Sequence, residues 1–305
     1  MSASVEIKER LSDHDIAEVL GVVEAATDAD GVRPLNEHVM LHLRYGGDDQ
    51  ARSVLLRVGS ELAGYAHVDP TDEVEGPSGE LVIHPSFRRQ GYGRRLLRAV
   101  LDLTGGRLRL WAHGGTPGSD ALARSAGLER VRSLWQMRRS LYAPLPTVPM
   151  PEGVVVRTFV PGQDEEEWLK VNAAAFAHHP EQGAWTIDDV RLRESESWFD
   201  PAGFFLAERD GRMVGFHWTK VHGSHDHGHE PIGEVYVVGV DPSQQGTGLG
   251  KALTMVGLCH LRSRGLAQAM LYVDEDNPAA IRLYTGLGFS RWDVDVMYAS
   301  TPSEN

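Results

Sequence analysis

The stretch that decides the fold is DPSQQGTGLGKAL, Asp241–Leu253. It follows an apolar run, Glu234–Val240, that is typical of a strand, and it leads into an amphipathic segment, Lys251–Arg264, that is typical of a helix. A glycine turn that opens a helix exposes backbone N–H groups at the positive end of the helix dipole. The stretch therefore predicts an anion-binding turn between a strand and a helix.

Two common phosphate motifs do not fit this turn. A P-loop has four residues between its glycines and a Ser or Thr after its lysine, but three residues separate Gly246 from Gly250, and Ala252 follows Lys251. The dinucleotide fingerprint G-x-G-x-x-G fails because Lys251 stands at its third glycine. An NTPase and a dinucleotide-binding domain are both disfavoured.

The same order of signals occurs twice in the chain. HPSFRRQGYGRRLL, residues 84–97, again places a glycine turn between a strand and a helix, about 157 positions earlier. A proline-rich, nearly uncharged segment, Leu141–Gly153, separates the halves. The repeat predicts an internal duplication with a domain at 1–140, a linker at 141–152 and a domain at 153–300. Each domain is expected to be α+β, with a central, mostly antiparallel mixed sheet flanked by helices. In the second half, strands are predicted at Val154–Phe159, Phe204–Glu208, Met213–Val221, Ala269–Val273 and Asp293–Tyr298, and the last helix at Pro278–Leu287.

Composition limits the function classes. The chain has 305 residues and a net charge of −13, which argues against general nucleic-acid binding. No apolar run approaches the ~18 residues of a membrane span, and the first residues lack a signal-peptide core, so we expect a cytoplasmic protein. The single cysteine, Cys259, is expected to be a buried, inert thiol.

Both glycine turns resemble the signature Q/R-x-x-G-x-G/A of the GNAT acetyltransferase superfamily, which binds acetyl-CoA through its pyrophosphate. A closer likeness runs along the whole chain. DGVRPLNEH (30–38), AFAHHPEQGAW (175–185), WFDPAGFFLA (198–207), GFHWTKVH (215–222) and GEVYVVGVDP (233–242) resemble the mycothiol synthases of actinobacteria. That family consists of tandem-domain enzymes that acetylate the cysteinyl amine of Cys-GlcN-Ins. The resemblance implies acetyl-CoA as cosubstrate, with one molecule expected in each domain, and no metal. We also expect a monomer.

The resemblance also implies which residues bind acetyl-CoA. Two groups of residues would contact it in each half: the strand before the turn, and the turn with the start of its helix. In the first half these are Leu81, Val82, Ile83, Arg88, Arg89, Gln90, Gly91, Tyr92, Gly93 and Arg94. In the second half they are Val238, Gly239, Val240, Gln245, Gly246, Thr247, Gly248, Leu249, Gly250 and Lys251, joined by Asn277 and Arg282. The plainer alternative for the last two is a helix N-cap and a surface charge.

Acetylation of an amine requires a base for the ammonium proton and an acid for the departing thiolate. By resemblance, Glu234 is the base and Tyr284 the acid. A phenol, with a pKa of ~10, keeps its proton at pH 7 and can give it to a thiolate, whose acid has a pKa of ~8.5. The repeat aligns Pro77 with Glu234 and Ala123 with Tyr284. The first half is therefore expected to bind acetyl-CoA or support the fold without turnover, with Glu80 as a less favoured stand-in base.

The resemblance places the acceptor among Glu37, Glu181, Lys220, Glu234 and Tyr272. The four histidines of VHGSHDHGHE, residues 221–230, invite a metal site, but a glycine-rich connection suits a polar loop better. Two other functions stay open. One is GNAT chemistry on a different amine, such as an aminoglycoside, a polyamine or a protein N-terminus. The other is a non-catalytic acetyl-CoA sensor.

Overall fold

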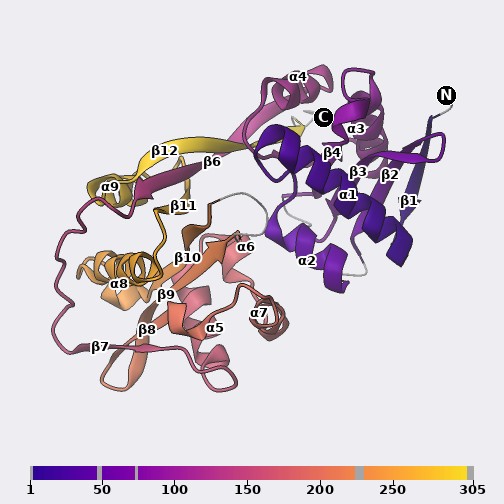
Figure 1. The fold of residues 1–305 in the computed structure, drawn as a ribbon. Helices are drawn as coiled ribbons and strands as arrows, with labels where there is room; N and C mark the ends of the chain where they lie inside the picture. The colour runs from indigo at the N-terminus through magenta and orange to yellow at the C-terminus, as the bar shows by residue number, and fades with distance from the viewer. Residues whose placement is uncertain (1–2, 47–49, 73–74, 224–229, 301–305) are drawn as a thin grey trace, which may run out of the picture. The chain divides into compact units, whose positions relative to one another are not determined.

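The structure is a computed structural model that describes residues 3–46, 50–72, 75–223 and 230–300. The chain forms two compact units. The first contains Met1–Trp135, Asp274–Asp276 and Asp293–Asn305, and the second contains Gln136–Val273 and Asn277–Trp292. Each unit has a sheet with helices on both faces, which confirms the predicted α+β class (Figure 1).

The first unit is built around one mixed sheet. Its strands lie in the order β1-β2-β3-β4-β5-β12, antiparallel except for the parallel pair β4 and β5. Its elements are β1 (Ala3–Lys8), α1 (Asp13–Asp30), α2 (Glu37–Tyr45), β2 (Arg52–Val58), β3 (Glu61–Asp69), β4 (Ser78–Ile83), α3 (Tyr92–Leu103), β5 (Arg109–Ala112), α4 (Pro117–Ser125) and the first part of β6 (Leu128–Ser140).

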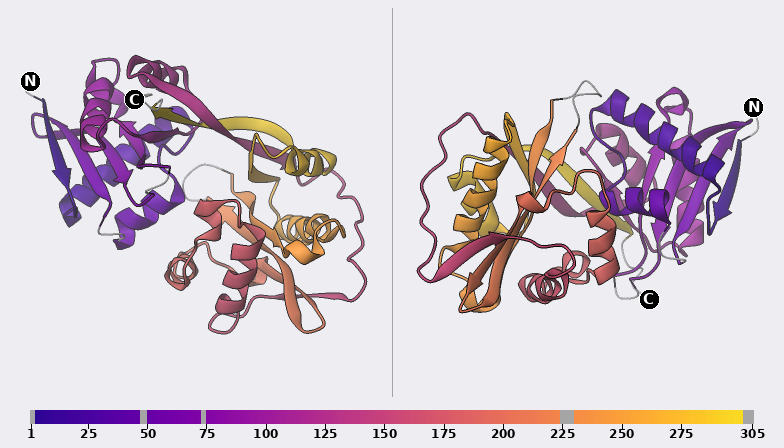
Figure 2. Two further views of the ribbon diagram at one scale, coloured as in Figure 1. Left: turned by 180° about the vertical axis from the view of Figure 1, so that it is seen from behind. Right: turned by 60° about the horizontal axis from the view of Figure 1, so that its bottom comes forward.

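The second unit repeats this plan with the strand order β6-β11-β10-β9-β8-β7. Figure 2 shows its sheet and helices from two further sides. Its elements are β7 (Val154–Thr158), α5 (Glu165–Ala175), α6 (Pro180–Gly183), α7 (Ile187–Glu194), β8 (Phe204–Arg209), β9 (Arg212–His222), β10 (Ile232–Val240), α8 (Leu249–Ser263), β11 (Gln268–Asp274), α9 (Pro278–Gly286) and the start of β12 (Ser290–Ser300). The predicted strands and the last helix agree with these bounds to within a few residues.

Strands β6 and β12 each run from one unit into the other. Val296–Ala299 of β12 pair with β5 of the first unit, whereas β6 lies beside β11, where the Leu141 amide donates to the Ala267 carbonyl at 2.8 Å. In a simple tandem repeat, each half would complete its own sheet. The boundaries predicted from the sequence follow the chain rather than the sheets, and they stay a prediction of where the two repeats begin and end.

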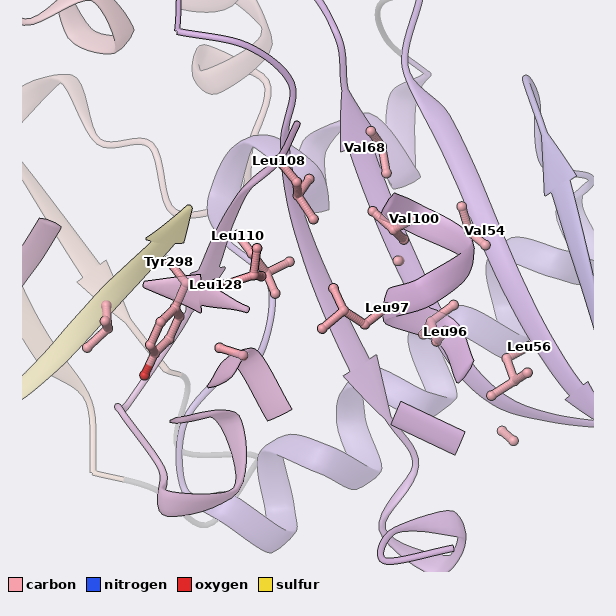
Figure 3. Packing of buried hydrophobic residues seen from close by; sticks show 14 of the residues in the cluster. Val54, Leu56, Val68, Leu96, Leu97, Val100, Leu108, Leu110, Leu128 and Tyr298 are labelled. Atoms are coloured by element: carbon pink, nitrogen blue, oxygen red, sulfur yellow. The ribbon is translucent and has the colours of Figure 1, made fainter. Parts of the chain in front are cut away.

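Apolar side chains on α3 cover one face of the first sheet. Leu96, Leu97 and Val100 of α3 are at most 1% exposed and pack on β2, β3 and β5 together with Tyr298 of β12 (Figure 3). The core of the second unit is aromatic instead: Phe204 stacks on Trp218 with ring centres 4.4 Å apart.

The structure contradicts one further expectation. Cys259 was expected inside the core, but it is exposed. It lies on α8 between the fully buried Leu258 and Leu261, and a step of about 100° from Leu258 turns it toward solvent. Among the described residues, no helix is long and apolar enough to cross a membrane.

Candidate active site

The parallel strands of each unit separate partway along their length. In the second unit the described pairing of β10 with β11 covers Gly233–Ala269 and Glu234–Met270, and in the first unit β4 pairs with β5 from Ser78 to Glu80. The following residues, Val235–Val240 and Leu81–Ile83, therefore present a strand edge to the opening. A ligand that carries amides can pair with such an edge.

Each opening ends at a glycine turn. Gly248 (φ 87°) is the N-cap of α8 and Gly91 (φ 86°) is the N-cap of α3, and within the described residues neither cap has a side-chain hydrogen bond. The first amides of both helices therefore point outward without a capping oxygen, which is the geometry of an anion site. A Cβ at either glycine would meet no atom within 4 Å, so glycine is required by the positive φ rather than by crowding.

The first turn carries Arg88 and Arg89 at the positions where the second turn carries Gln245 and Gly246. Arg89 adopts φ 61°, the left-handed conformation that Gly246 (φ 78°) adopts in the second turn. Its neighbour Arg88 makes a bidentate ion pair with Asp30, both N–O distances being 2.7 Å. A non-glycine residue in this conformation is strained, and such strain is common at functional sites.

A cavity of about 750 Å³ lies in the first unit beside its turn. This volume is within the range of small-molecule sites. Most of the predicted coenzyme contacts line it, namely Leu81, Val82, Ile83, Arg88, Arg89, Gly91, Gly93 and Arg94. Of the other two, Gln90 donates to the Ser86 carbonyl at 3.0 Å and Tyr92 packs edge-on against Phe87.

In the second unit the predicted coenzyme residues occupy β10, the turn and the first turn of α8. Val238, Gly239 and Val240 lie at the end of β10, Gln245, Gly246, Thr247 and Gly248 form the turn, and Leu249, Gly250 and Lys251 begin the helix. Thr247 Oγ1 donates to the Gln244 carbonyl at 2.7 Å, which braces the turn. Asn277 caps α9 by accepting from the Ala280 amide at 3.0 Å, and Arg282 is exposed on the same helix.

Glu234 lies where β10 and β11 separate. It is only 6% exposed, and its Oε2 accepts a hydrogen bond from His222 Nε2. Lys220 stands directly opposite it on β9. The Lys220 ammonium lies 4.2 Å from the ring centre of Trp198 and 5.0 Å from that of Tyr236. The face shared by β9 and β10 thus brings together a buried carboxylate, an imidazole and a cation held over aromatic rings.

Tyr284 lies on α9, with its ring edge-on to Phe289 at 5.9 Å. Burial of the hydroxyl raises its pKa to about 12. The phenol therefore stays protonated at neutral pH and is suited to donating a proton rather than taking one.

The remaining predicted acceptor contacts are spread over three elements. Tyr272 of β11 is 39% exposed, and its hydroxyl accepts from Gln136 Nε2 at 2.9 Å. Glu37 is the half-buried first residue of α2. Glu181 lies in α6, but its side chain is outside what the structure describes.

The first unit has a different arrangement at its opening. Ala123, which the repeat aligns with Tyr284, is a buried residue of α4. Glu80 is the last paired residue before β4 and β5 separate, as Glu234 is in β10, but its Oε1 binds His113 Nε2 at 3.1 Å and its Oε2 accepts from the Asn36 amide at 2.7 Å. A carboxylate that is 2% exposed and bonded at both oxygens is poorly placed to act as the stand-in base.

His113 joins Glu80 to Asp295, a residue of β12. Its Nδ1 lies 2.8 Å from Asp295 Oδ2, and the Gly114 amide donates to Asp295 Oδ1 at 2.9 Å. Burial alone would lower the pKa of His113, but the charge of Glu80 and the hydrogen bonds to both carboxylates raise it to about 10. The buried cluster of Glu80, His113 and Asp295 was missed by sequence reasoning, because 182 residues separate His113 from Asp295.

No group of three His, Cys, Asp or Glu side chains within the described ranges is arranged to hold a metal ion. Of the four histidines considered as a metal site, His225, His227 and His229 lie outside those ranges.

Comparison with known proteins identifies the family of this chain. The model of the acetyltransferase (GNAT) family matches residues 22–127 and 168–289, one match in each half. In solved structures, a GCN5-related N-acetyltransferase from Sphaerobacter thermophilus is 25% identical with a TM-score of 0.68, covering 98% of this chain and 96% of that one. A tandem GNAT protein from the clavulanic acid biosynthesis pathway has the same fold, with a TM-score of 0.75 at 18% identity over 99% of this chain and all of that one. The chain belongs to the GNAT acetyltransferase family.

Similarity to curated proteins identifies a group within this family. A mycothiol acetyltransferase from Streptosporangium roseum is 65% identical, with 98% of this chain and 99% of that protein covered. Another, from Thermobispora bispora, is 61% identical over the same shares. Within the GNAT family, the chain groups with the mycothiol acetyltransferases.

Proposed function

We propose that this enzyme transfers the acetyl group of acetyl-CoA to the cysteinyl amine of Cys-GlcN-Ins, and that the second unit performs the reaction. The observation that carries the proposal is that this unit contains both a buried carboxylate at the strand opening and a protonated phenol on α9. The first unit has neither group in a usable form, since both oxygens of Glu80 are bonded, one to His113 and one to the Asn36 amide, and Ala123 has no functional group.

The chemistry needs three proton movements. Glu234 takes a proton from the ammonium group, so that the nitrogen lone pair can attack the thioester carbonyl. A C–N bond forms and the C–S bond breaks as Tyr284 gives its proton to the departing thiolate. The nitrogen then loses its second proton to solvent to give the neutral amide, and a proton from solvent restores the Tyr284 phenol. The amides at the N-terminus of α8 bind the pyrophosphate, and the edge of β10 aligns the pantetheine arm.

The first unit is proposed to bind a second acetyl-CoA without turnover. Its cavity and glycine turn support binding, whereas its opening lacks a base and an acid. Glu37, Glu181, Lys220 and Tyr272 remain the predicted acceptor contacts. The monomeric state and the cytoplasmic location also remain predictions.

The test is a reaction with acetyl-CoA and Cys-GlcN-Ins followed by mass spectrometry. We expect a product heavier by one acetyl group, no product from Glu234→Gln within the same time, and no comparable product from an aminoglycoside or a polyamine. Acetylation of one of those amines instead would replace the proposed acceptor. Coenzyme binding without any acetylated amine would favour the sensor function.

A further inference from the structure

The proposed reaction does not use His222, the one histidine of the stretch 221–230 that the structure describes. His222 is the last residue of β9, and its Nε2 lies 2.5 Å from Oε2 of Glu234. The hydrogen bond connects two adjacent strands of the second unit, where His222 pairs with Ile232 and Lys220 pairs with Glu234. Residues two apart on a strand face the same side. Lys220, His222 and Glu234 therefore lie on one face of the sheet.

The two partners differ in exposure. The Glu234 side chain is 8% exposed, and that of His222 is 33% exposed. A hydrogen bond from an N–H group to one oxygen of a carboxylate fixes the orientation of the group and leaves the other oxygen to accept a proton. His222 supplies such a donor from the solvent side of the pair.

We propose that His222 is a positioning residue for the general base: its Nε2–H holds Oε2 of Glu234, so that the second oxygen, Oε1, is directed at the acceptor amine. This inference rests on the proposed function, in which Glu234 takes the ammonium proton. His222 itself takes no proton from the substrate and touches no reacting atom. Its role corresponds to that of the group that orients a catalytic base in other enzymes.

The cation on this face, Lys220, is held differently. The Lys220 ammonium lies over the rings of Trp198 and Tyr236, and the Tyr236 hydroxyl is itself fixed by a hydrogen bond from Arg193 Nε at 2.9 Å. Cation–π contacts of this kind are favourable in partly desolvated sites. The aromatic rings thus fix the position of Lys220, while His222 fixes the orientation of the carboxylate.

The test compares two replacements of His222. In His222→Leu the donor is lost, and we expect kcat to fall by about tenfold or more, a part of the ~10²–10⁴-fold that a positioned base contributes. In His222→Gln an N–H donor is retained, and kcat should recover most of that loss. The KM for acetyl-CoA should change less than about twofold in both, because an orienting bond acts mainly on the transition state.

A double mutant separates this inference from the function on which it rests. If His222 acts through Glu234, then His222→Leu should cause no further loss in a Glu234→Gln background. A normal kcat in Glu234→Gln alone would remove the proposed base, whereas a large loss there with a normal kcat in folded His222→Leu would overturn only the role of His222. Equal losses in the Leu and Gln variants, or additive losses in the double mutant, would also overturn it.

A measurement on the unmodified site covers the case in which His222→Leu does not fold. In ¹⁵N-histidine spectra of the wild-type enzyme, the His222 Nε2 should be protonated and hydrogen-bonded, and Glu234→Gln should shift that resonance. A His222 whose Nε2 carries no proton in the wild type would contradict the proposal.

Discussion

Replacing His113 by leucine removes the cation from the buried cluster of the first unit. Two carboxylates, Glu80 and Asp295, are then left in the interior without the imidazolium that they share. Breaking a buried ion pair by removing one partner typically costs about 3–5 kcal/mol. For a unit of this size, each kcal/mol lowers Tm by about 2–4 °C, so a decrease of roughly 10 °C is expected.

The pKa of His113 allows a second calculation of the same loss in the free energy of unfolding. It rises from 6.5 to about 10 on folding. At 1.36 kcal/mol for each pKa unit, the protonated imidazole contributes up to about 5 kcal/mol. Since the pKa is raised in the folded state, this contribution is complete below pH 6.5 and is lost as the pH rises through about 10. The difference between the wild type and His113→Leu should therefore be about 3 kcal/mol smaller at pH 9 than at pH 6.5.

His67 is a matched control in the same unit. It is 3% exposed on β3, and neither ring nitrogen has a hydrogen-bond partner among the described residues. Burial lowers its pKa to about 3. Its unfavourable effect is absent above pH 6.5 and grows as the pH falls. Between high pH and pH 5, the free energy of unfolding of the wild type should fall by about 2 kcal/mol relative to that of a variant without this group, His67→Leu. The two histidines thus predict opposite pH trends.

The assay is a urea titration with pulsed hydrogen exchange, read at peptides from β2 and β3, which report on the first unit alone. Measurements at pH 5, 6.5 and 9 cover both windows. A loss for His113→Leu below about 1 kcal/mol, or one that does not change between pH 6.5 and 9, would refute the charged state assigned to His113.

The remaining predictions concern the second unit and its counterpart. Glu234→Gln should lower kcat by ~10²–10⁴-fold and remove the acidic limb of the pH–rate profile, and a nearly normal rate at neutral pH would make Glu234 a binding residue only. Tyr284→Phe should lower kcat, and the decrease should be smaller with an acyl donor whose thiol has a lower pKa. The free energy of unfolding should change by no more than about 1 kcal/mol. An unchanged kcat with a lower Tm would assign Tyr284 to the core and remove its role as the acid. Gly248→Val should abolish turnover because its φ of 87° and the approach of the pyrophosphate exclude a side chain, whereas Gly91→Val should leave much of kcat intact. Equal losses in a steady-state assay of both variants would contradict the division of labour between the units.

Much of the fold could be predicted because its signals are local. A glycine turn, a hairpin and a helix cap each depend on a few neighbouring residues, and the repetition of their order in the two halves indicated the duplication. The same local signals placed Glu234 on a strand before a turn and Tyr284 on the last helix. His222 was not predicted on a strand: the predicted strand ended at Val221 and the residues after it were assigned to a polar loop, whereas β9 extends to His222.

Only the tertiary structure decided which strand completes which sheet. The exposed edge of a strand offers the same amide and carbonyl groups whatever its sequence, so the residues of β6 and β12 carry no local signal that selects β11 or β5 as their neighbour. The same holds for the cluster of Glu80, His113 and Asp295. Its partners are brought together by the exchange of β12 over a separation of 182 residues, and its charge state follows from burial and mutual bonding that no single segment contains.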